Sequence, residues 1–246
     1  MEDLEIWHLI CIVIIDAGAG FVQRVSGFGL GIFAMLFLPS FMPATSAAAI
    51  SCLFSCGTST YNTIQNRKQI PFKTILPLLC AAAVVIPVAV LCAPYVPAKI
   101  FKILLGIVLI LLSLYFLFFS GKIKMKASFG NGIIAGALGG ALNGLFSTGG
   151  PPAVIYLSNA TDSNAAYFAA IQCYFCLTNI YSTVIRIFNC IITLDLLICA
   201  AIGFVGCMAG NFVGKLVFDK LDAKKLKFII YIGMIISGVL MIVQAK

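Results

Sequence analysis

The sequence Ser147-Thr148-Gly149-Gly150-Pro151-Pro152 lies within a run of 35 residues, Ala127 to Thr161, that contains no charged side chain. The run is long enough to cross a bilayer, yet glycine and proline at its centre interrupt a helix. Such an interruption frees backbone N–H and C=O groups that lipid cannot satisfy, so it is tolerated only where protein encloses it or where it lines a cavity. The stretch therefore predicts a broken helix beside an enclosed cavity.

A second interruption, Gln23 to Gly29, lies near the start of the chain. Adding 121 to the numbers of Ser26 and Gly29 gives Ser147 and Gly150, so the two interruptions are in register. Paired interruptions at equivalent places in two halves are the best sequence indication of a transporter's binding site. The pairing therefore predicts a transporter.

The composition excludes a soluble globular domain, because only 10% of the 246 residues are charged and the mean hydropathy is +1.11. The net charge of +8 comes from Lys and Arg in short loops between apolar runs, which indicates membrane topology and not nucleic-acid binding. The sequence contains no HExxH, Walker or nucleophile-elbow motif. It therefore predicts neither an enzyme nor a cofactor or metal site.

The apolar runs predict an all-α polytopic membrane protein, in which residues 1–246 form a single transmembrane transporter domain. Two five-element repeats are predicted, at about 6–120 and about 127–245, with about 8–10 transmembrane segments in all. Each repeat opens with a hairpin of one long and one short arm around its interruption, followed by three crossings. The predicted elements are 6–22, 28–38, 44–65, 73–95 and 99–120 in the first repeat, and 129–147, 151–159, 164–186, 194–214 and 226–244 in the second.

The basic residues predict the orientation of the chain. Eleven of the 16 Lys and Arg residues, in clusters near Lys68, Lys124 and Lys224, fall on one side if each hairpin returns to its own face. The positive-inside rule makes that side cytoplasmic, so both termini of this multi-pass cell-membrane protein are predicted to be extracytoplasmic. Five elements per repeat make the two repeats inverted, which brings the hairpins together near the midplane.

The helix ends at the two interruptions predict an anion site. Each short arm begins at its interruption, and a helix N-terminus gathers unpaired N–H groups and partial positive charge. Glycines let the backbone approach a ligand; close helix packing by small residues is the alternative explanation. The candidate substrate-binding residues are Ser26, Gly27 and Gly29 at the first interruption, and Asn143, Ser147, Thr148, Gly149 and Gly150 at the second.

Two charged residues belong to the first hairpin. Arg24 lies in the interruption, and an arginine at bilayer depth costs about 2.5–3.5 kcal/mol on insertion scales, so it requires a partner or a ligand. A guanidinium holds an oxyanion with a bidentate fork, which makes Arg24 a further candidate for substrate binding. A position at the outer surface and a pair with Asp16 are equal alternatives. Asp16 is a candidate for proton coupling.

The remaining polar and sulfur-containing residues predict packing more than chemistry. Ten cysteines lie in apolar segments, which favours thiols packed as small residues over a disulfide framework. Cys173 and Cys176 have the spacing of a redox motif but no βαβ context. Gln172, Asn179 and Asn62 lie in predicted crossings, where cavity lining and helix-to-helix hydrogen bonds are equally consistent.

These features resemble the TauE/SafE sulfite exporter family, also called the toluene sulfonate uptake permease family. The halves of its members open with a glycine-rich segment that ends in a Ser/Thr-Gly-Phe-Gly-like or Gly-Gly-Pro-like element. In this sequence those elements are Gln23 to Gly31 and Gly139 to Pro152, and the repeat covers essentially the whole chain. The resemblance implies movement of sulfite, sulfonates and related sulfur-containing anions, by export or by import.

The interruptions and the resemblance together predict a secondary transporter for a small sulfur-containing oxyanion, with proton coupling left open. The same helix ends would serve a passive anion channel, or a transporter of another small organic anion. The predicted partners are the small anion and the lipid bilayer, without nucleic acid. Assembly into a homo-oligomer is left open.

Overall fold

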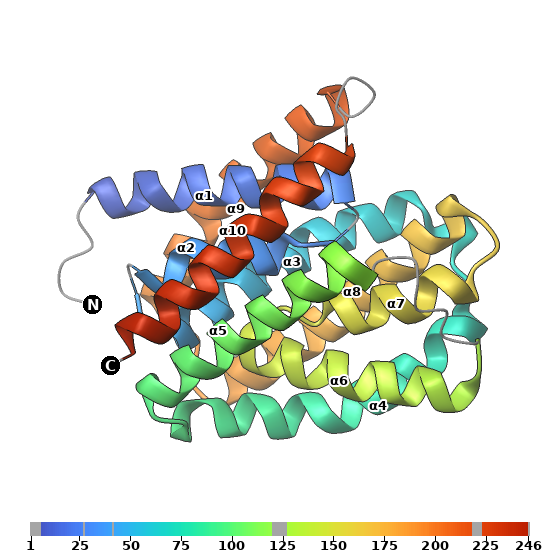
Figure 1. Cartoon of the computed structure of the whole chain (residues 1–246), viewed down its shortest axis with the longest axis horizontal. Helices are drawn as coiled ribbons and strands as arrows, with labels where there is room; N and C mark the ends of the chain where they lie inside the picture. The colour runs from blue at the N-terminus through green and yellow to red at the C-terminus, as the bar shows by residue number, and fades with distance from the viewer. Residues whose placement is uncertain (1–5, 27, 41, 120–126, 218–222, 246) are drawn as a thin grey trace.

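A computed structural model describes residues 6–26, 28–40, 42–119, 127–217 and 223–245. These residues form a bundle of long helices (Figure 1), and no strand occurs among them, so the predicted all-α architecture is confirmed. The helices are α1 (Ile6–Ser26), α2 (Leu30–Phe37), α3 (Ala44–Gln65), α4 (Phe72–Cys92), α5 (Ala98–Leu114), α6 (Phe129–Phe146), α7 (Gly150–Ala160), α8 (Asn164–Phe188), α9 (Leu194–Val217) and α10 (Ala223–Gln244).

Several helices have the length and composition of membrane-spanning segments. Among the described residues, five segments are long and apolar enough to cross a bilayer: Phe72–Tyr95, Ala98–Phe118, Phe129–Phe146, Asn164–Phe188 and Leu194–Leu216. The α3 helix is also long, with 22 residues, but one of its faces is polar and buried, with Ser51, Ser55, Thr58 and Asn62 in register. The prediction of a multi-pass membrane protein is confirmed.

Both predicted hairpins form, with a longer first arm than expected. The short arms α2 and α7 have 8 and 11 residues, about 12 and 17 Å at about 1.5 Å per residue, or roughly half the hydrocarbon core. The long arm α1 extends to Ser26 and not to residue 22, because residues 23–26 include no glycine or proline. Gln23 and Arg24 therefore belong to the last turns of α1.

The long arms pack against helices of the opposite half of the chain. The most extensive helix pairs are α1 with α9 and α4 with α6. Glycines let these backbones approach closely: a Cβ on Gly206 or Gly210 would collide with carbonyl oxygens of α1, and one on Gly136 would collide with the Leu78 carbonyl of α4. In the two predicted repeats, α1 is equivalent to α6 and α4 is equivalent to α9. The pair α1 with α9 is therefore the equivalent of the pair α6 with α4.

The two hairpins enter the bundle from opposite ends. In Figure 1, α1 begins at the left and α6 begins at the right. This arrangement and the reciprocal helix pairs are what an inverted repeat requires. The symmetry relation itself stays a prediction.

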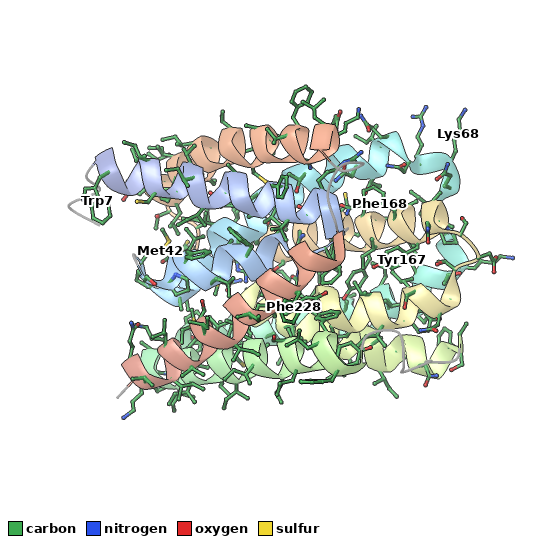
Figure 2. The ribbon with its side chains drawn as sticks, turned by 45° about the horizontal axis from the view of Figure 1, so that its top comes forward. Trp7, Met42, Lys68, Tyr167, Phe168 and Phe228 are labelled. Atoms are coloured by element: carbon green, nitrogen blue, oxygen red, sulfur yellow. The ribbon has the colours of Figure 1, made fainter. Side chains whose placement is uncertain are left out.

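The two ends of the bundle carry different residues. Figure 2 shows Trp7 and Met42 at one end and Lys68, in the exposed turn Arg67–Gln69, at the other. The α1 helix begins and α10 ends at the end that carries Trp7 (Figure 1). The basic segments at 120–126 and 218–222 lie outside the described residues. Which end faces the cytoplasm stays a prediction.

Candidate functional site

The second interruption closes the end of α6 with its own backbone. Ser147 has a φ of 54°, in the left-handed region, and turns the chain out of the helix. Its N–H donates to the carbonyl of Asn143 over 2.9 Å, and the N–H of Thr148 donates to the carbonyl of Leu142 over 3.2 Å. These bonds satisfy two carbonyls that a broken helix would otherwise leave unpaired.

The α7 helix begins directly after this turn. Gly149 precedes it, and Gly150, Pro151 and Pro152 form its start. Prolines fit there because N–H groups of a first turn have no acceptor within the helix. Since proline carries no N–H, the backbone donors at this helix end are those of Gly149 and Gly150. A Cβ on Gly149 would collide with the carbonyl of Gly139, so the turn packs directly on α6.

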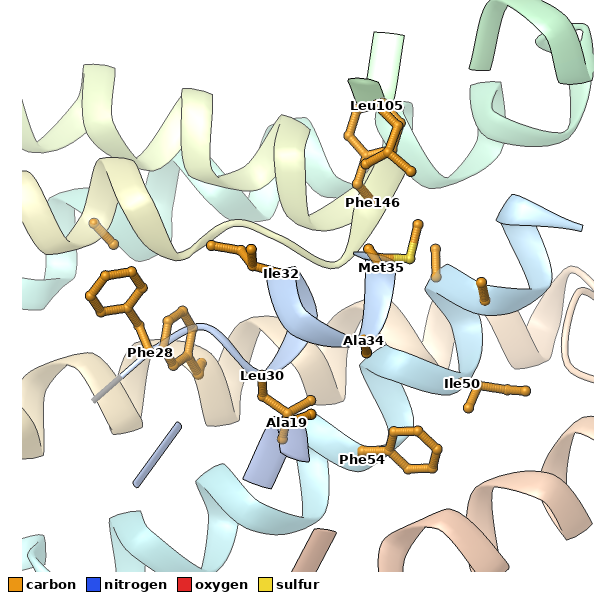
Figure 3. Packing of buried hydrophobic residues seen from close by; sticks show 14 of the residues in the cluster. Ala19, Phe28, Leu30, Ile32, Ala34, Met35, Ile50, Phe54, Leu105 and Phe146 are labelled. Atoms are coloured by element: carbon orange, nitrogen blue, oxygen red, sulfur yellow. The ribbon is translucent and has the colours of Figure 1, made fainter. Parts of the chain in front are cut away.

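The first interruption lies against the second. Gly29 precedes α2 with a φ of 109°, a conformation that glycine adopts without steric cost. A Cβ on Gly31 would collide with the carbonyl oxygen of Ser147, so the backbones of the two interruptions are in direct contact. Figure 3 shows Ile32, in the first turn of α2, beside the loop that follows α6. The two interruptions meet inside the protein, as predicted.

A buried cavity lies at this meeting point. Its volume is about 20 Å³, counted as space open to the centres of water molecules, which is room for about one water. The α1, α3 and α8 helices complete its wall. The lining residues are Gln23, Gly29, Leu30, Gly31, Ile32, Ser55, Asn143, Ser147, Thr148, Gly149, Gly150, Phe175 and Asn179.

Most of the residues proposed from the sequence lie at this cavity. The structure brings together Gly29, Asn143, Ser147, Thr148, Gly149 and Gly150. The side chain of Ser26 and all of Gly27 lie outside the described residues. Ser55 and Phe175 are lining residues that the sequence did not indicate, because α3 and α8 reach the cavity only through tertiary packing.

The polar side chains at the cavity differ in whether they have partners. Ser147 Oγ donates to the Ala48 carbonyl over 2.6 Å, and Asn143 Nδ2 donates to Asn179 Oδ1 over 2.7 Å. Thr148 Oγ1 and Asn143 Oδ1 are buried and have no hydrogen-bond partner in the described part of the chain. An unpartnered buried polar atom costs about 1–3 kcal/mol. These two atoms therefore indicate that the cavity takes up a ligand or water.

A network of buried amides continues from the cavity toward the turn that carries Lys68. Gln23 Oε1 accepts from Thr58 Oγ1 over 3.1 Å, and Gln23 Nε2 donates to Gln172 Oε1 over 3.4 Å. Asn62 Nδ2 donates to the same oxygen of Gln172 over 3.4 Å. Of the two roles left open for the polar residues, Gln172 and Asn62 show helix-to-helix hydrogen bonding. Asn179 shows both roles.

Arg186 in α8 is a buried cation that the sequence analysis did not single out. It is 3% exposed; Nη1 donates to Ser182 Oγ over 2.6 Å, and Nη2 donates to the carbonyl of Gly144 over 2.7 Å. Gly144 lies in the last turn of α6. Helix C-termini carry partial negative charge, which a nearby cation offsets. Arg186 therefore neutralises the end of α6 next to the cavity.

Arg24 has a related position in the first hairpin. It lies in the last turn of α1 and is half-buried. Its stem packs beside α9, where a Cβ on Gly214 would lie 3.0 Å from Arg24 Cβ. Arg24 does not line the cavity among the residues that the structure describes. Each long arm nevertheless ends beside an arginine, one from its own last turn and one from α8.

Asp16 is fully buried between α1, α3 and α9. Both carboxylate oxygens are without a hydrogen-bond partner among the described residues, so the alternative pair with Arg24 does not form. Gly203 of α9 leaves room for the carboxylate, since a Cβ there would collide with Asp16 Oδ2 and lie 2.6 Å from the Phe54 ring. An unpaired buried carboxyl is costly to keep. Asp16 stands apart from the cavity but remains a functional candidate.

The cysteines are all free, and half of them are buried between helices: Cys52, Cys173, Cys176, Cys199 and Cys207. The thiol of Cys52 in α3 donates to the backbone carbonyl of Asn179 over 3.5 Å and lies 3.5 Å from Thr183 Oγ1. Cys176 Sγ lies 3.3 Å from Thr60 Oγ1. These contacts agree with thiols that serve as small, polarisable packing groups.

Membrane-spanning helices and two broken hairpins that meet at a buried polar cavity are the features of a polytopic membrane transport protein. The family model described as sulfite exporter TauE/SafE matches residues 12–241, nearly the whole chain, and the chain belongs to this family. The resemblance drawn from the two interruptions is thereby confirmed. The family is one of transporters and not of enzymes. No curated protein and no solved structure gives a significant match.

Proposed function

We propose that this protein is a secondary transporter that carries a small sulfur-containing oxyanion, such as sulfite or a sulfonate, across the cell membrane. The observation that carries the proposal is the buried cavity between two interruptions that lie 121 residues apart in register. Gly29 and Gly31 form one side of it, and Gly149 and Gly150 form the other. Family membership supports the class of substrate.

The electrostatics of the cavity favour an anion. The N-termini of α2 and α7 both begin at its wall, and each contributes N–H donors and partial positive charge. The opposing term is the C-terminal end of α6, which Arg186 offsets through the Gly144 carbonyl. Arg24 lies in the last turn of α1, where its positive charge opposes the negative end of that helix. The helix N-termini and the two arginines therefore favour an anion at the cavity.

The donors suit an oxyanion with several oxygens. Two helix ends approach it from different directions, and the unpartnered hydroxyl of Thr148 supplies a further donor. The bond from Asn143 Nδ2 to Asn179 fixes the amide so that Asn143 Oδ1 is left as an acceptor. Hydrogensulfite carries an O–H that can donate to this oxygen. Hydrogensulfite can therefore make one more hydrogen bond here than a sulfonate, which carries no O–H.

The closed state of the cavity is what a transporter requires between its two open states. Room for about one water cannot hold sulfite, so the anion enters only when the surrounding helices move. A protein that must move for each anion alternates between states, whereas a channel offers a continuous path. Anion flux in proteoliposomes separates the two: accumulation against a gradient supports the transporter, and purely downhill flux contradicts it.

Substrate class is tested by a thermal-shift screen of the purified protein. Sulfite, sulfate, thiosulfate, taurine, sulfoacetate and carboxylate controls are compared at equal ionic strength. A ligand that binds the folded state at 100 times its Kd stabilises it by about 2.7 kcal/mol. Stabilisation by sulfite or a sulfonate, with none by carboxylates, is the expected result. Stabilisation by carboxylates alone would point to a different organic anion.

Thr148→Val is expected to weaken anion binding about tenfold or more. The change removes the unpartnered hydroxyl at nearly constant volume, and a hydrogen bond to a charged group contributes about 1.5–3 kcal/mol. Ser147→Ala is the matched comparison, because the Ser147 hydroxyl already donates to the Ala48 carbonyl. It should lower the melting temperature more than the affinity. Titration of both purified variants checks this; equal loss of affinity in the two would contradict it.

Asp16→Asn is expected to uncouple transport from the proton gradient. The side chain keeps its size and its place beside Gly203, but loses the proton that a carboxyl can release. Anion binding in the thermal-shift assay should persist, because Asp16 does not line the cavity. Accumulation driven by a pH gradient in proteoliposomes should fall to the downhill level. Undiminished accumulation would remove Asp16 from the coupling mechanism.

A further inference from the structure

We infer that the anion reaches the cavity through a vestibule lined by Lys102, and that the rings of Phe101 and Phe146 form the gate between the two. This inference rests on the proposed function, because it supplies the route for the same anion.

The vestibule is a groove of about 780 Å³ between the α2–α3 and α4–α5 connections. Met42 and Thr45 contribute to one wall, and Tyr95 and Lys102 to the other. Figure 2 places Met42 at the end of the bundle that carries Trp7, opposite Lys68. The predicted orientation makes this the extracytoplasmic end.

The charge of the groove suits an anion. Lys102 is half-buried in its wall, and the described residues that line it include no carboxylate. A cleft whose charge is of one sign raises the local concentration of the oppositely charged solute. The volume is large enough for a hydrated sulfite or sulfonate, since one water takes about 30 Å³ of liquid.

The groove approaches the cavity through one aromatic pair. Phe101 lines the groove and is 2% exposed, and its ring centroid lies 4.9 Å from that of Phe146 in an edge-on arrangement. Phe146 is the residue immediately before Ser147, which lines the cavity. Figure 3 shows Phe146 at the end of α6, where the chain leaves for the second interruption. The pair therefore lies between groove and cavity.

The wall of the groove that α3 forms also leads to the cavity. Thr45 of α3 lines the groove, and Ala48, about one turn deeper, accepts the hydrogen bond from Ser147 Oγ. The groove can hold the anion, whereas the cavity in its present state cannot. Passage from one to the other therefore requires that Phe146 and Ser147 move, and these neighbours move together. The aromatic pair is thus the closed outer gate of the transport cycle.

The vestibule is tested with thiol reagents of opposite charge on Thr45→Cys, with labelling measured by mass spectrometry and wild type as the background. The anionic reagent is sulfonatoethyl methanethiosulfonate, which carries a sulfonate, and the cationic reagent is its trimethylammonium counterpart. The rate of each reagent is divided by its rate with a small free thiol. On this scale the anionic reagent should react several-fold faster than the cationic one, and Lys102→Gln should remove that preference. Equal relative rates for both reagents would overturn the vestibule.

The gate is tested at Ser55→Cys, which places a thiol in the cavity wall by exchanging one atom. The sulfonate reagent is applied from the side on which Thr45→Cys reacts, to intact cells or inverted vesicles. Adding Phe146→Leu should raise the labelling of Ser55→Cys by about fivefold or more, because the edge-on ring contact is lost. Phe101→Leu should act in the same direction. Unchanged labelling in both would overturn the gate.

The control is Phe168→Leu, the same substitution in a half-buried ring near the start of α8 that lines neither the cavity nor the groove. It should leave the labelling of Ser55→Cys unchanged, and an equal rise there would reduce the gate to general loosening. The labelling requires no substrate. If sulfite fails in the thermal-shift screen while the labelling results are as expected, the proposed substrate is overturned and the route is kept. If sulfite binds while the labelling results are not as expected, the route is overturned and the substrate is kept.

Discussion

Arg186→Gln is expected to weaken anion binding by at least about tenfold and to lower the melting temperature by several degrees. The guanidinium makes two buried hydrogen bonds, and a bond from a charged group contributes about 1.5–3 kcal/mol. Its loss leaves the Gly144 carbonyl unpaired and exposes the cavity to the negative end of α6. Arg186→Lys keeps the charge but loses the fork that reaches both acceptors, so an intermediate effect is expected.

Arg24→Gln is the matched comparison, since it makes the same change of charge at the end of the other long arm. Arg24 is half-buried and does not line the described cavity, so its replacement should weaken binding less. Titration of sulfite against both variants and both lysine variants decides between the two arginines. If Arg24→Gln gave the larger loss, the sequence-based assignment of the anion to Arg24 would be right and that to Arg186 wrong.

Gly31→Ala is expected to abolish transport by separating the two interruptions. A Cβ at Gly31 would collide with the carbonyl oxygen of Ser147, and both are backbone positions that cannot swing aside. One methyl group must therefore push α2 away from the second interruption and open the cavity wall. Flux in proteoliposomes and the melting temperature of the purified variant measure the effect.

Alanine variants of three other glycines are the comparisons for Gly31→Ala. Gly130 in α6 has nothing within 4 Å of an added Cβ, so Gly130→Ala should transport normally and gain a little helix stability. A Cβ on Gly150 would lie 3.0 Å from the Phe175 ring, a side chain that can give way, so Gly150→Ala should lower affinity and keep the fold. At Gly149 the obstacle is the Gly139 carbonyl, and the fold should suffer as well. Normal transport by Gly31→Ala would mean that the interruptions do not act as one site.

The order and length of the helices could be read from the sequence because each depends on local composition. Charge-free runs set the crossings, and the glycines and prolines after Ser147 set the start of α7 to within one residue of the predicted 151. The first interruption was placed too early, since Gln23 and Arg24 are polar but remain helical. Polarity alone does not end a helix that is enclosed by protein, whereas the left-handed backbone of Gly29 cannot belong to one.

The residues that the sequence did not indicate reach the site through tertiary packing. Arg186 ends the predicted crossing 164–186, where an arginine reads as a flanking charge at the membrane surface. Because α6 ends inside the protein, the Gly144 carbonyl lies within hydrogen-bond distance of Arg186. Ser55 and Phe175 likewise sit in unremarkable helical stretches. A charged residue at the end of a crossing opposite a broken helix is the one signal that could have indicated Arg186.

The reciprocal packing of α1 on α9 and of α6 on α4 has a consequence for biogenesis. The α1 helix carries the buried side chains of Asp16 and Gln23, and it leaves the ribosome well before its enclosing partner α9. Through most of translation the nascent chain therefore holds a carboxyl and an amide in the bilayer without their final neighbours. Lateral release of α1 into lipid is disfavoured until α9 has been made. The insertion machinery is accordingly expected to retain it, and a chain truncated before α9 should be recognised as misfolded and degraded.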